Sequence, residues 1–248
     1  MGEYVELPAV RTWYEVEGQG EPIVLLHGGF CTNETWGPQR ADFAADHLTF
    51  LPERRAHGHT PDVEGPLSYH DMAQDTVDFL GSVVGGAAHL VGWSDGGIVA
   101  LLVAIERPDL VRKIVASGAG FRPASEFGPT EGLDPPAELR SMYEAASPDG
   151  AEHWPVVVGK MVEMFRAEPD IPIEDLRSIG APTLVLVGDD DAVPLEHTIE
   201  LYRAIPNSEL AVVPGTSHLH LMEKPSLVNR IVLDFLDDDA GTPSRGFG

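Results

Sequence analysis

The sequence predicts an α/β fold built on an open, doubly wound and mostly parallel sheet. Short apolar runs bounded by turn residues alternate with segments of helical periodicity, which is the pattern of βαβ units. One long segment interrupts this alternation and has helical character only, which indicates a small helical cap inserted between two strands.

The apolar runs and helical segments give the expected elements. Strands are predicted over residues 22–26, 47–52, 88–91, 113–116, 183–187 and 210–213. Helices are predicted over residues 69–84, 96–106, 195–204 and 226–236. The alternating run over residues 11–17 predicts an antiparallel edge hairpin with the strand that begins near Pro22.

The interruption covers residues 121–176, between the predicted strands 113–116 and 183–187. It is rich in Pro, Glu and Gly at first and then contains two helical stretches, residues 137–146 and 152–167. An insertion at the end of the sheet where strands finish is placed to cover a site. We therefore expect an α/β core of residues 1–120 and 177–248 and a helical cap, or lid, of residues 121–176. An ordinary long crossover is the alternative.

The composition limits the partners. Among 248 residues, 16 are Lys or Arg and 40 are Asp or Glu, so the formal charge is −24. Such a surface repels phosphate, so neither nucleic acid nor an anionic membrane is expected as a partner. The one cysteine, Cys31, excludes an intrachain disulfide. The acidic N-terminus lacks a secretory pattern, and no apolar run approaches the ~18 residues needed to span a bilayer. We expect a cytoplasmic monomer or homodimer that acts on a small molecule.

Residues 92–97, Gly-Trp-Ser-Asp-Gly-Gly, contain the candidate nucleophile, Ser94. They directly follow a predicted strand and directly precede a predicted helix. A serine on such a sharp turn is presented above the sheet, and the flanking glycines let neighbouring backbone pass. The helix N-terminus favours developing negative charge.

A serine nucleophile needs a base and a group that orients the base, in the chain order serine, acid, histidine on such a sheet. Asp191 is the predicted acid; Asp189 is expected to cap the turn and Asp190 to face solvent. His218 is the predicted base because it ends the last strand, whereas His220 lies inside the following segment.

Acyl transfer also needs donors for the oxyanion. We expect the backbone N–H groups of Asp95 and Gly29, with Phe30 as an alternative to Gly29. Asp95, Trp93 and Phe30 are the candidate substrate-binding residues. No metal site is expected, because His57 and His59 have no third ligand nearby.

These residues resemble the α/β-hydrolase superfamily over nearly the whole chain. The matching motifs are His-Gly-Gly at residues 27–29, the Ser94 turn, Gly188-x-x-Asp191, and His218 followed by Glu-Lys-Pro at residues 223–225. Residues 92–98 and 34–39 look like the valacyclovir hydrolase (biphenyl hydrolase-like) branch. Residues 53–59 depart from the usual pattern, which has Asp first and Gly in place of Ala56.

The resemblance implies an α/β-hydrolase fold and a serine esterase with a Ser–Asp–His triad and no cofactor. It also implies that Asp95 contacts the ammonium group of amino-acid esters. Lactones, amides, C–C bonds and perhydrolysis are alternative reactions of the same triad. A ligand-binding receptor that keeps the fold and pocket without catalysis is the alternative of a different class.

Overall fold

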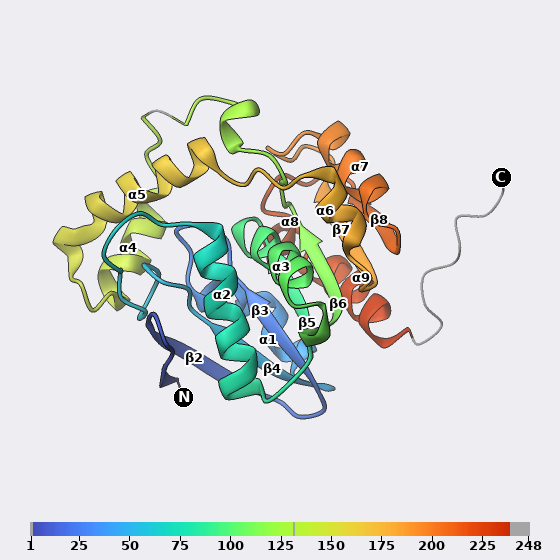
Figure 1. The fold of residues 1–248 in the computed structure, drawn as a ribbon, viewed down its shortest axis with the longest axis horizontal. Coiled ribbons are helices and arrows are strands. Elements are labelled where there is room, and N and C mark those ends of the chain that lie inside the picture. Colours follow the sequence, from blue (N-terminus) through green and yellow to red (C-terminus); the bar gives the residue numbers. More distant parts are fainter. Residues whose placement is uncertain (1, 131, 239–248) are drawn as a thin grey trace.

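An eight-stranded sheet forms the centre of the computed structural model, which describes residues 2–130 and 132–238 (Figure 1). The strand order is β1-β2-β4-β3-β5-β6-β7-β8. β2 pairs antiparallel with β1 and β4, and the other neighbours are parallel, which confirms the predicted fold class. The strands are Glu3–Glu6 (β1), Arg11–Glu17 (β2), Glu21–Leu26 (β3), His47–Pro52 (β4), Ala88–Trp93 (β5), Val111–Ser117 (β6), Thr183–Gly188 (β7) and Ser208–Val213 (β8).

Helices cover both faces of the sheet, and alternate strand residues feed two separate apolar cores. Ile23 and Leu25 of β3 pack in the core beneath α1 and α9, whereas Val24 and Leu26 pack in the core beneath α2 and α3. The helices are Gly37–Phe43 (α1), Tyr69–Phe79 (α2), Asp95–Glu106 (α3), Ala137–Ala146 (α4), Trp154–Ala167 (α5), Ile173–Ser178 (α6), Leu195–Ala204 (α7), His220–Glu223 (α8) and Pro225–Asp237 (α9).

Shorter helical turns complete the chain. A π-helical turn, Leu80–Val84, continues α2 to the end of the predicted helix 69–84. The 3₁₀ turns are Asn33–Trp36, Pro108–Leu110, Ala124–Glu126 and Ala151–His153.

The predicted hairpin between residues 11–17 and the strand beginning near Pro22 is wrong. β2 lies between β1 and β4, and both edges of β3 are occupied by its parallel partners β4 and β5. The chain leaves β2 through Gly18 and Gly20, whose φ angles are 75° and 119°. A side chain at either glycine would overlap carbonyl oxygens at the start of β4. The chain therefore crosses tightly over β4 instead of folding back beside β2.

Between β6 and β7 the chain forms an insertion that contains α4 and α5, which lie at one end of the molecule (Figure 1). Buried Asp62 attaches it to the rest of the chain: Lys160 Nζ of α5 lies 2.7 Å from its carboxylate and His153 Nε2 lies 2.8 Å from it. The boundary expected after residue 176 falls inside α6, which packs against α3 and α7. Residue 131 of the expected cap and residues 239–248 of the expected core lie outside the described residues.

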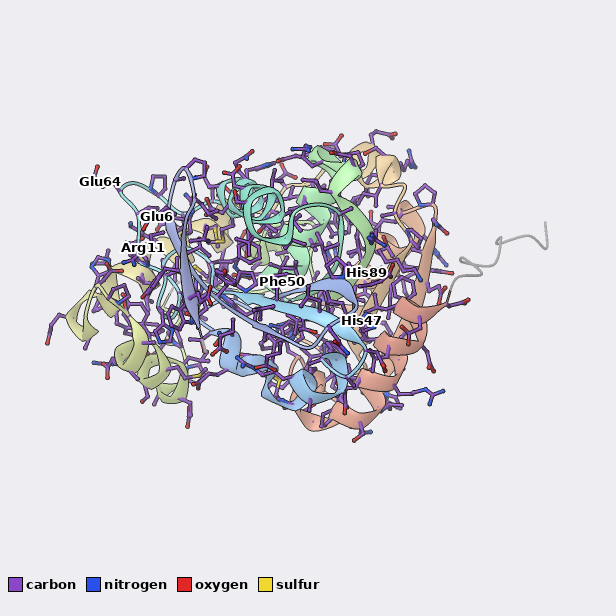
Figure 2. All side chains as sticks on the ribbon, turned by 90° about the horizontal axis from the view of Figure 1, so that it is seen from below. Glu6, Arg11, His47, Phe50, Glu64 and His89 are labelled. Carbon is purple, nitrogen blue, oxygen red and sulfur yellow. The ribbon has the colours of Figure 1, made fainter. Side chains whose placement is uncertain are left out.

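The parallel strands give the sheet two chemically different ends. In Figure 2, Glu6 and Arg11 lie toward the left of the sheet and His47 and His89 toward the right. These histidines lie at the starts of β4 and β5. The carboxyl ends of the parallel strands therefore lie at the opposite end of the sheet from His47 and His89. The loops that follow the strands gather at these carboxyl ends.

His197 of α7 holds the beginning of the insertion. Its Nε2 accepts a hydrogen bond of 3.0 Å from the N–H of Phe121, and the two rings stack with centroids 4.1 Å apart. Burial, with the positive charge of Arg122, lowers the pKa of His197 to about 4. The imidazole is therefore neutral in the folded protein at neutral pH.

We predict that His197→Gln makes the protein less sensitive to acid. As the pH falls below about 6.5, the unfolded chain binds a proton at residue 197 before the folded protein does. The contribution of His197 to stability is thus present above pH 6.5 and is lost as the pH falls toward 4. Urea unfolding at pH 7.5 and 4.5 should show a smaller loss of unfolding free energy in the variant. Equal losses in the two proteins would contradict the prediction.

Candidate active site

Ser94 occupies a strained turn between β5 and α3. Its φ and ψ angles are 54° and −120°, a region that non-glycine residues rarely adopt. A side chain at Gly92 would overlap the backbone of Gly96, and one at Gly96 would overlap the carbonyl of Leu26. The glycines of this motif are therefore required for the close backbone approach that presents the Ser94 hydroxyl at the sheet end.

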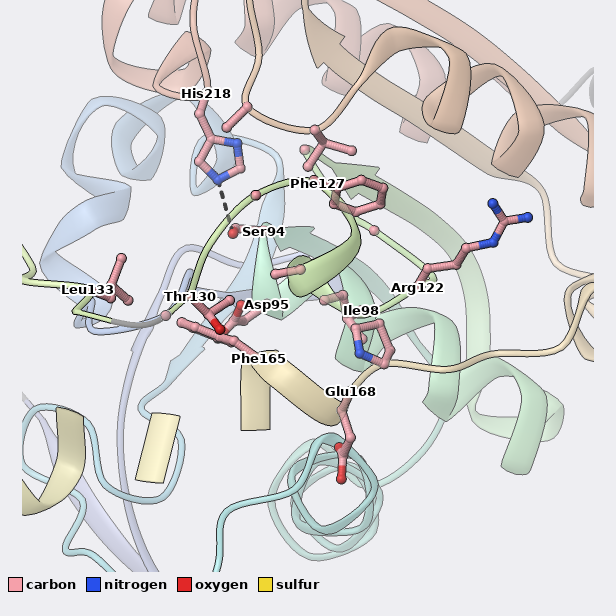
Figure 3. A pocket seen from close by; sticks show the side chains of 18 of the residues that line it. Ser94, Asp95, Ile98, Arg122, Phe127, Thr130, Leu133, Phe165, Glu168 and His218 are labelled. Carbon is pink, nitrogen blue, oxygen red and sulfur yellow. Dashed lines mark hydrogen bonds between the residues drawn. The ribbon is translucent and has the colours of Figure 1, made fainter. Parts of the chain in front are cut away.

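Ser94, His218 and Asp191 form a continuous hydrogen-bonded chain. His218 Nε2 lies 3.0 Å from Ser94 Oγ, the contact drawn as a dashed line in Figure 3. His218 Nδ1 lies 2.7 Å from Asp191 Oδ1. Burial alone would raise the pKa of Asp191, but hydrogen bonds from His218 and from the Val193 N–H outweigh burial and lower the pKa. Asp191 is therefore ionised beside the imidazole, as orientation of His218 requires.

The neighbouring carboxylates occupy other positions. Asp189 Oδ1 accepts a hydrogen bond of 2.9 Å from the N–H of Thr216, and Asp190 is exposed to solvent. His220 is buried, with Nε2 2.6 Å from the hydroxyl of Ser117. Its Nδ1 lies 3.7 Å from the second oxygen of Asp191. His220 thus lies behind the carboxylate, on the side away from Ser94.

Two backbone N–H groups beside Ser94 are available as donors. Within residues 2–130 and 132–238, no hydrogen bond uses the N–H of Gly29 or of Asp95. Phe30, the alternative donor, differs because its N–H donates to Nε2 of His57 at 3.0 Å. The geometry therefore leaves Gly29 and Asp95 as the free pair and removes Phe30 from it.

A cavity of about 440 Å³ opens onto Ser94 and His218 (Figure 3). This size is in the range of small-molecule sites. Its wall is mostly apolar, and the insertion supplies much of it. The side chains that the insertion contributes include Phe127, Thr130, Leu133 and Phe165.

Trp93, one of the candidate substrate-binding residues, does not line this cavity. Its indole Nε1–H donates to the backbone oxygen of His218 at 3.0 Å, and its ring packs against the imidazole and against Gly28. Its ring belongs to the core beneath α1 and α9, so the structure does not place Trp93 in the cavity wall. Trp93 supports the His218 loop instead.

The side chain of Asp95 is buried, and in the described part of the chain only one of its two carboxylate oxygens has a hydrogen-bond partner. Its Oδ1 accepts a hydrogen bond of 2.8 Å from the hydroxyl of Tyr69, and its Oδ2 has no partner among the described residues. Burial keeps the pKa of Asp95 above its ordinary value, although the positive charge of Arg54 and the Tyr69 hydrogen bond partly oppose this rise. Tyr69 begins a predicted helix, and nothing in the local sequence pattern indicated its contact with Asp95.

The other charged side chains of the cavity are already paired. Glu168 accepts a hydrogen bond of 2.8 Å from the N–H of Tyr69. Arg122 lies 2.7 Å from the carboxylate of Glu200. Among the carboxylate and guanidinium groups of the described residues that line the cavity, Asp95 therefore has the buried oxygen without a partner, Oδ2.

No cluster of three or more metal-binding side chains occurs in the part of the chain that the structure describes. His57 lies between the N–H of Phe30 and the carbonyl of Arg55, and His59 contacts Glu53. Over the same residues, no helix is long and apolar enough to cross a bilayer.

The strand order, the Ser94 turn and the insertion before β7 together define a hydrolase of the α/β class. The chain belongs to the alpha/beta hydrolase family, whose model matches residues 23–231. Serine hydrolase BPHL of Mus musculus is 29% identical over 253 residues, which cover 94% of this chain and 85% of that protein. The resemblance to the biphenyl hydrolase-like branch is thereby confirmed.

Two further comparisons show the breadth of the family. The putative carbamate hydrolase RutD of Azorhizobium caulinodans is 28% identical over 251 residues, covering 90% of this chain and 94% of that protein. Among solved structures, the CarC serine hydrolase involved in carbazole degradation superposes with a TM-score of 0.81 at 23% identity. That superposition covers 95% of this chain and 98% of CarC, and shows the shared fold.

We predict that Ser94→Gly is more stable than Ser94→Ala. Both variants lack the hydroxyl, but only glycine relieves the backbone strain, which costs about 1–3 kcal/mol at such positions. The greater freedom of glycine in the unfolded chain offsets about 0.5–1 kcal/mol of this gain. Urea unfolding should therefore show a net advantage of about 1 kcal/mol for the glycine variant.

The matched control is Ser141, an exposed residue inside α4. There the order should reverse, because glycine is less favourable than alanine in a helix by about 1 kcal/mol. If the alanine variant were more stable than the glycine variant at both positions, the turn at Ser94 would not be strained.

Proposed function

We propose that the protein is a serine esterase that hydrolyses carboxylic esters of small molecules through a covalent acyl-enzyme. The observation that carries the proposal is the hydrogen-bonded chain from Ser94 through His218 to buried Asp191, at the wall of a mostly apolar cavity. The free N–H groups of Gly29 and Asp95 next to Ser94 complete the requirements of acyl transfer.

In the proposed reaction, Ser94 Oγ attacks the ester carbonyl carbon while its proton passes to Nε2 of His218. Asp191 accepts the Nδ1–H of His218, which fixes the tautomer and stabilises the imidazolium. The tetrahedral oxyanion accepts hydrogen bonds from Gly29 and Asp95, each worth a factor of about 10²–10³ in kcat. The bond to the alcohol then breaks, and His218 returns the proton to the leaving oxygen.

Water completes the cycle. His218 removes a proton from a water molecule as it attacks the acyl-Ser94 ester, and the same two N–H groups stabilise the second oxyanion. The bond between the acyl carbon and Ser94 Oγ then breaks, His218 returns the proton to Oγ, and the carboxylic acid leaves. Residues 121–176 act in this proposal as a cap, because Phe127, Leu133 and Phe165 enclose the acyl group and limit its size.

The cavity favours esters that carry a cationic group, such as amino-acid esters. Asp95 Oδ2 is buried and unpartnered beside Gly29, so it offers an acceptor within the cavity wall. An ammonium group of the substrate would satisfy this oxygen by a charge-assisted hydrogen bond. The negative net charge of the chain also attracts cationic substrates.

A carbamate or lactone hydrolase is the second candidate function. The same residues would attack a carbamate or a cyclic ester, and one similar protein is named a putative carbamate hydrolase. A binding protein without catalysis is disfavoured, because ligand binding alone does not require Ser94, His218 and Asp191 in hydrogen-bonding order.

The first test uses p-nitrophenyl acetate and butyrate. Ser94→Ala and His218→Ala should each lower kcat by at least about 10⁴-fold, because removal of the nucleophile or the base disables the whole unit. Circular dichroism and thermal unfolding should show that both variants remain folded. Full activity in either folded variant would refute the assignment.

The second test concerns the charge of Asp95. Valine benzyl ester and 3-methylbutanoate benzyl ester differ only in the amino group. Asp95→Asn keeps the backbone N–H but removes the charge, so the preference for the valine ester in kcat/KM should fall about 10- to 100-fold. An unchanged preference in the variant would show that Asp95 does not recognise the substrate cation.

A further inference from the structure

Arg54 is a buried guanidinium that donates to two backbone carbonyls, and its Nη2 also lies 3.3 Å from Nδ1 of His27. It follows β4 by two residues and is 4% exposed. Nη1 donates to the carbonyl oxygen of His27, and Nη2 donates to that of Gly28 at 3.1 Å. Among the described residues, Arg54 forms no ion pair within 4.0 Å, and the charge of Asp95 acts on it only from a greater distance. Burying a charge in this way is costly unless the charge interacts with a specific group.

The next residue, Arg55, shows the ordinary alternative. Its Nε and Nη2 lie 2.7 and 2.8 Å from the two oxygens of Asp75 on α2, a bidentate ion pair. Arg54 and Arg55 are thus equally buried neighbours with different partners. Only Arg54 contacts the segment that contains Gly29.

The side chain of His27 also contacts the carbonyl oxygen of Gly28, to which Arg54 donates. Its Nε2 accepts the N–H of Arg54 at 3.1 Å, so this nitrogen carries no proton. Burial lowers the pKa of His27 well below its usual value and keeps the ring neutral. The proton is therefore on Nδ1, which donates to the carbonyl oxygen of Gly28 at 2.8 Å. The N–H of Cys31 also donates to this oxygen, at 3.3 Å.

The carbonyl of Gly28 and the N–H of Gly29 belong to one trans peptide unit, so they point in opposite directions. Three donors on the oxygen fix the orientation of the peptide plane. They also draw electron density from it, which strengthens hydrogen bonds made by the N–H at the other end. Gly29 itself lines the cavity beside Ser94.

We infer that Arg54 is a positioning residue for the oxyanion: it holds and polarises the peptide unit between Gly28 and Gly29, so that the Gly29 N–H is set to stabilise the negative charge formed when Ser94 attacks a carbonyl. The inference rests on the proposed function, in which Gly29 is an oxyanion donor. The guanidinium acts through the peptide and does not touch the substrate.

A pair of ketones measures oxyanion stabilisation directly. Ser94 Oγ adds to the carbonyl carbon of 1,1,1-trifluoro-2-octanone, its proton goes to His218, and the carbonyl oxygen becomes an oxyanion. 2-Octanone has the same chain but forms little adduct. The inhibition constant of 2-octanone divided by that of the trifluoroketone therefore reports the stability of the oxyanion. General damage to the cavity weakens the binding of both ketones and leaves this ratio unchanged.

Arg54→Gln should reduce this ratio about tenfold, which is less than the loss of about 10²–10³ on removal of an oxyanion donor itself. The kcat for p-nitrophenyl acetate should fall by a similar factor, with KM within about twofold. Arg54→Lys keeps the charge, but an ammonium cannot match the planar fork that reaches both carbonyls, so its loss should be intermediate. Arg55→Lys is the matched control and should leave the ratio of inhibition constants at its wild-type value.

Either folded Arg54 variant with the wild-type ratio and kcat would overturn the inference while leaving the proposed function intact. An equal reduction of the ratio in Arg55→Lys would also overturn it, because the effect would not be specific to the Gly28 carbonyl. If the wild-type protein bound both ketones equally, no serine oxyanion would form, and the proposed function would fail together with the inference.

Discussion

The close approach of backbone segments around Ser94 is the constraint on which the rest of the site depends. The turn brings Gly96 against the carbonyl of Leu26 at the end of β3. The N–H of Ser94 donates to the carbonyl of Ser117 at 2.7 Å, at the end of β6. The end of β5 is thereby fixed relative to both of its neighbours. Because His218 and Asp191 follow β8 and β7 of the same sheet, their distance from Ser94 is set by parallel strand pairing.

The charges of the site are arranged in two separate groups. Asp191 is ionised and faces two imidazoles, and its charge is used within the chain that ends at Ser94. Asp95 lies on the other side of the nucleophile, between the hydroxyl of Tyr69 and the positive potential of Arg54. A buried carboxylate on each side of one serine can coexist because each has its own compensating partners. In the proposed function, the first group serves proton transfer and the second recognises the substrate cation.

Local sequence patterns predicted seven of the eight strands, the Ser94 turn and the positions of Asp191 and His218, because each depends on residues adjacent in the chain. They missed β1, Glu3–Glu6. They did not predict contacts between distant segments. β2 lies beside β4 because the turn at Gly18 and Gly20 crosses over a strand that comes later in the sequence. The N–H of Phe30 is occupied by His57, 27 residues away. Trp93 packs in the core beneath α1 and α9, and the motif around Ser94 does not specify which of the two cores receives it.

The insertion between β6 and β7 supplies cavity-lining side chains that lie outside the two apolar cores of the sheet. It is attached through Asp62, which contacts His153 just before α5 and Lys160 within α5. It is also attached through His197, which stacks on Phe121 and contacts the ring of the cavity-lining Phe127. Phe127 and Leu133 are not among the buried residues of either apolar core. Replacing the exposed Leu133 reshapes the binding volume with little effect on the sheet or its helices, whereas replacing Phe127 also removes a contact with His197 of α7. The cavity can therefore change shape at an exposed position of the insertion while the core that holds Ser94, Asp191 and His218 stays the same.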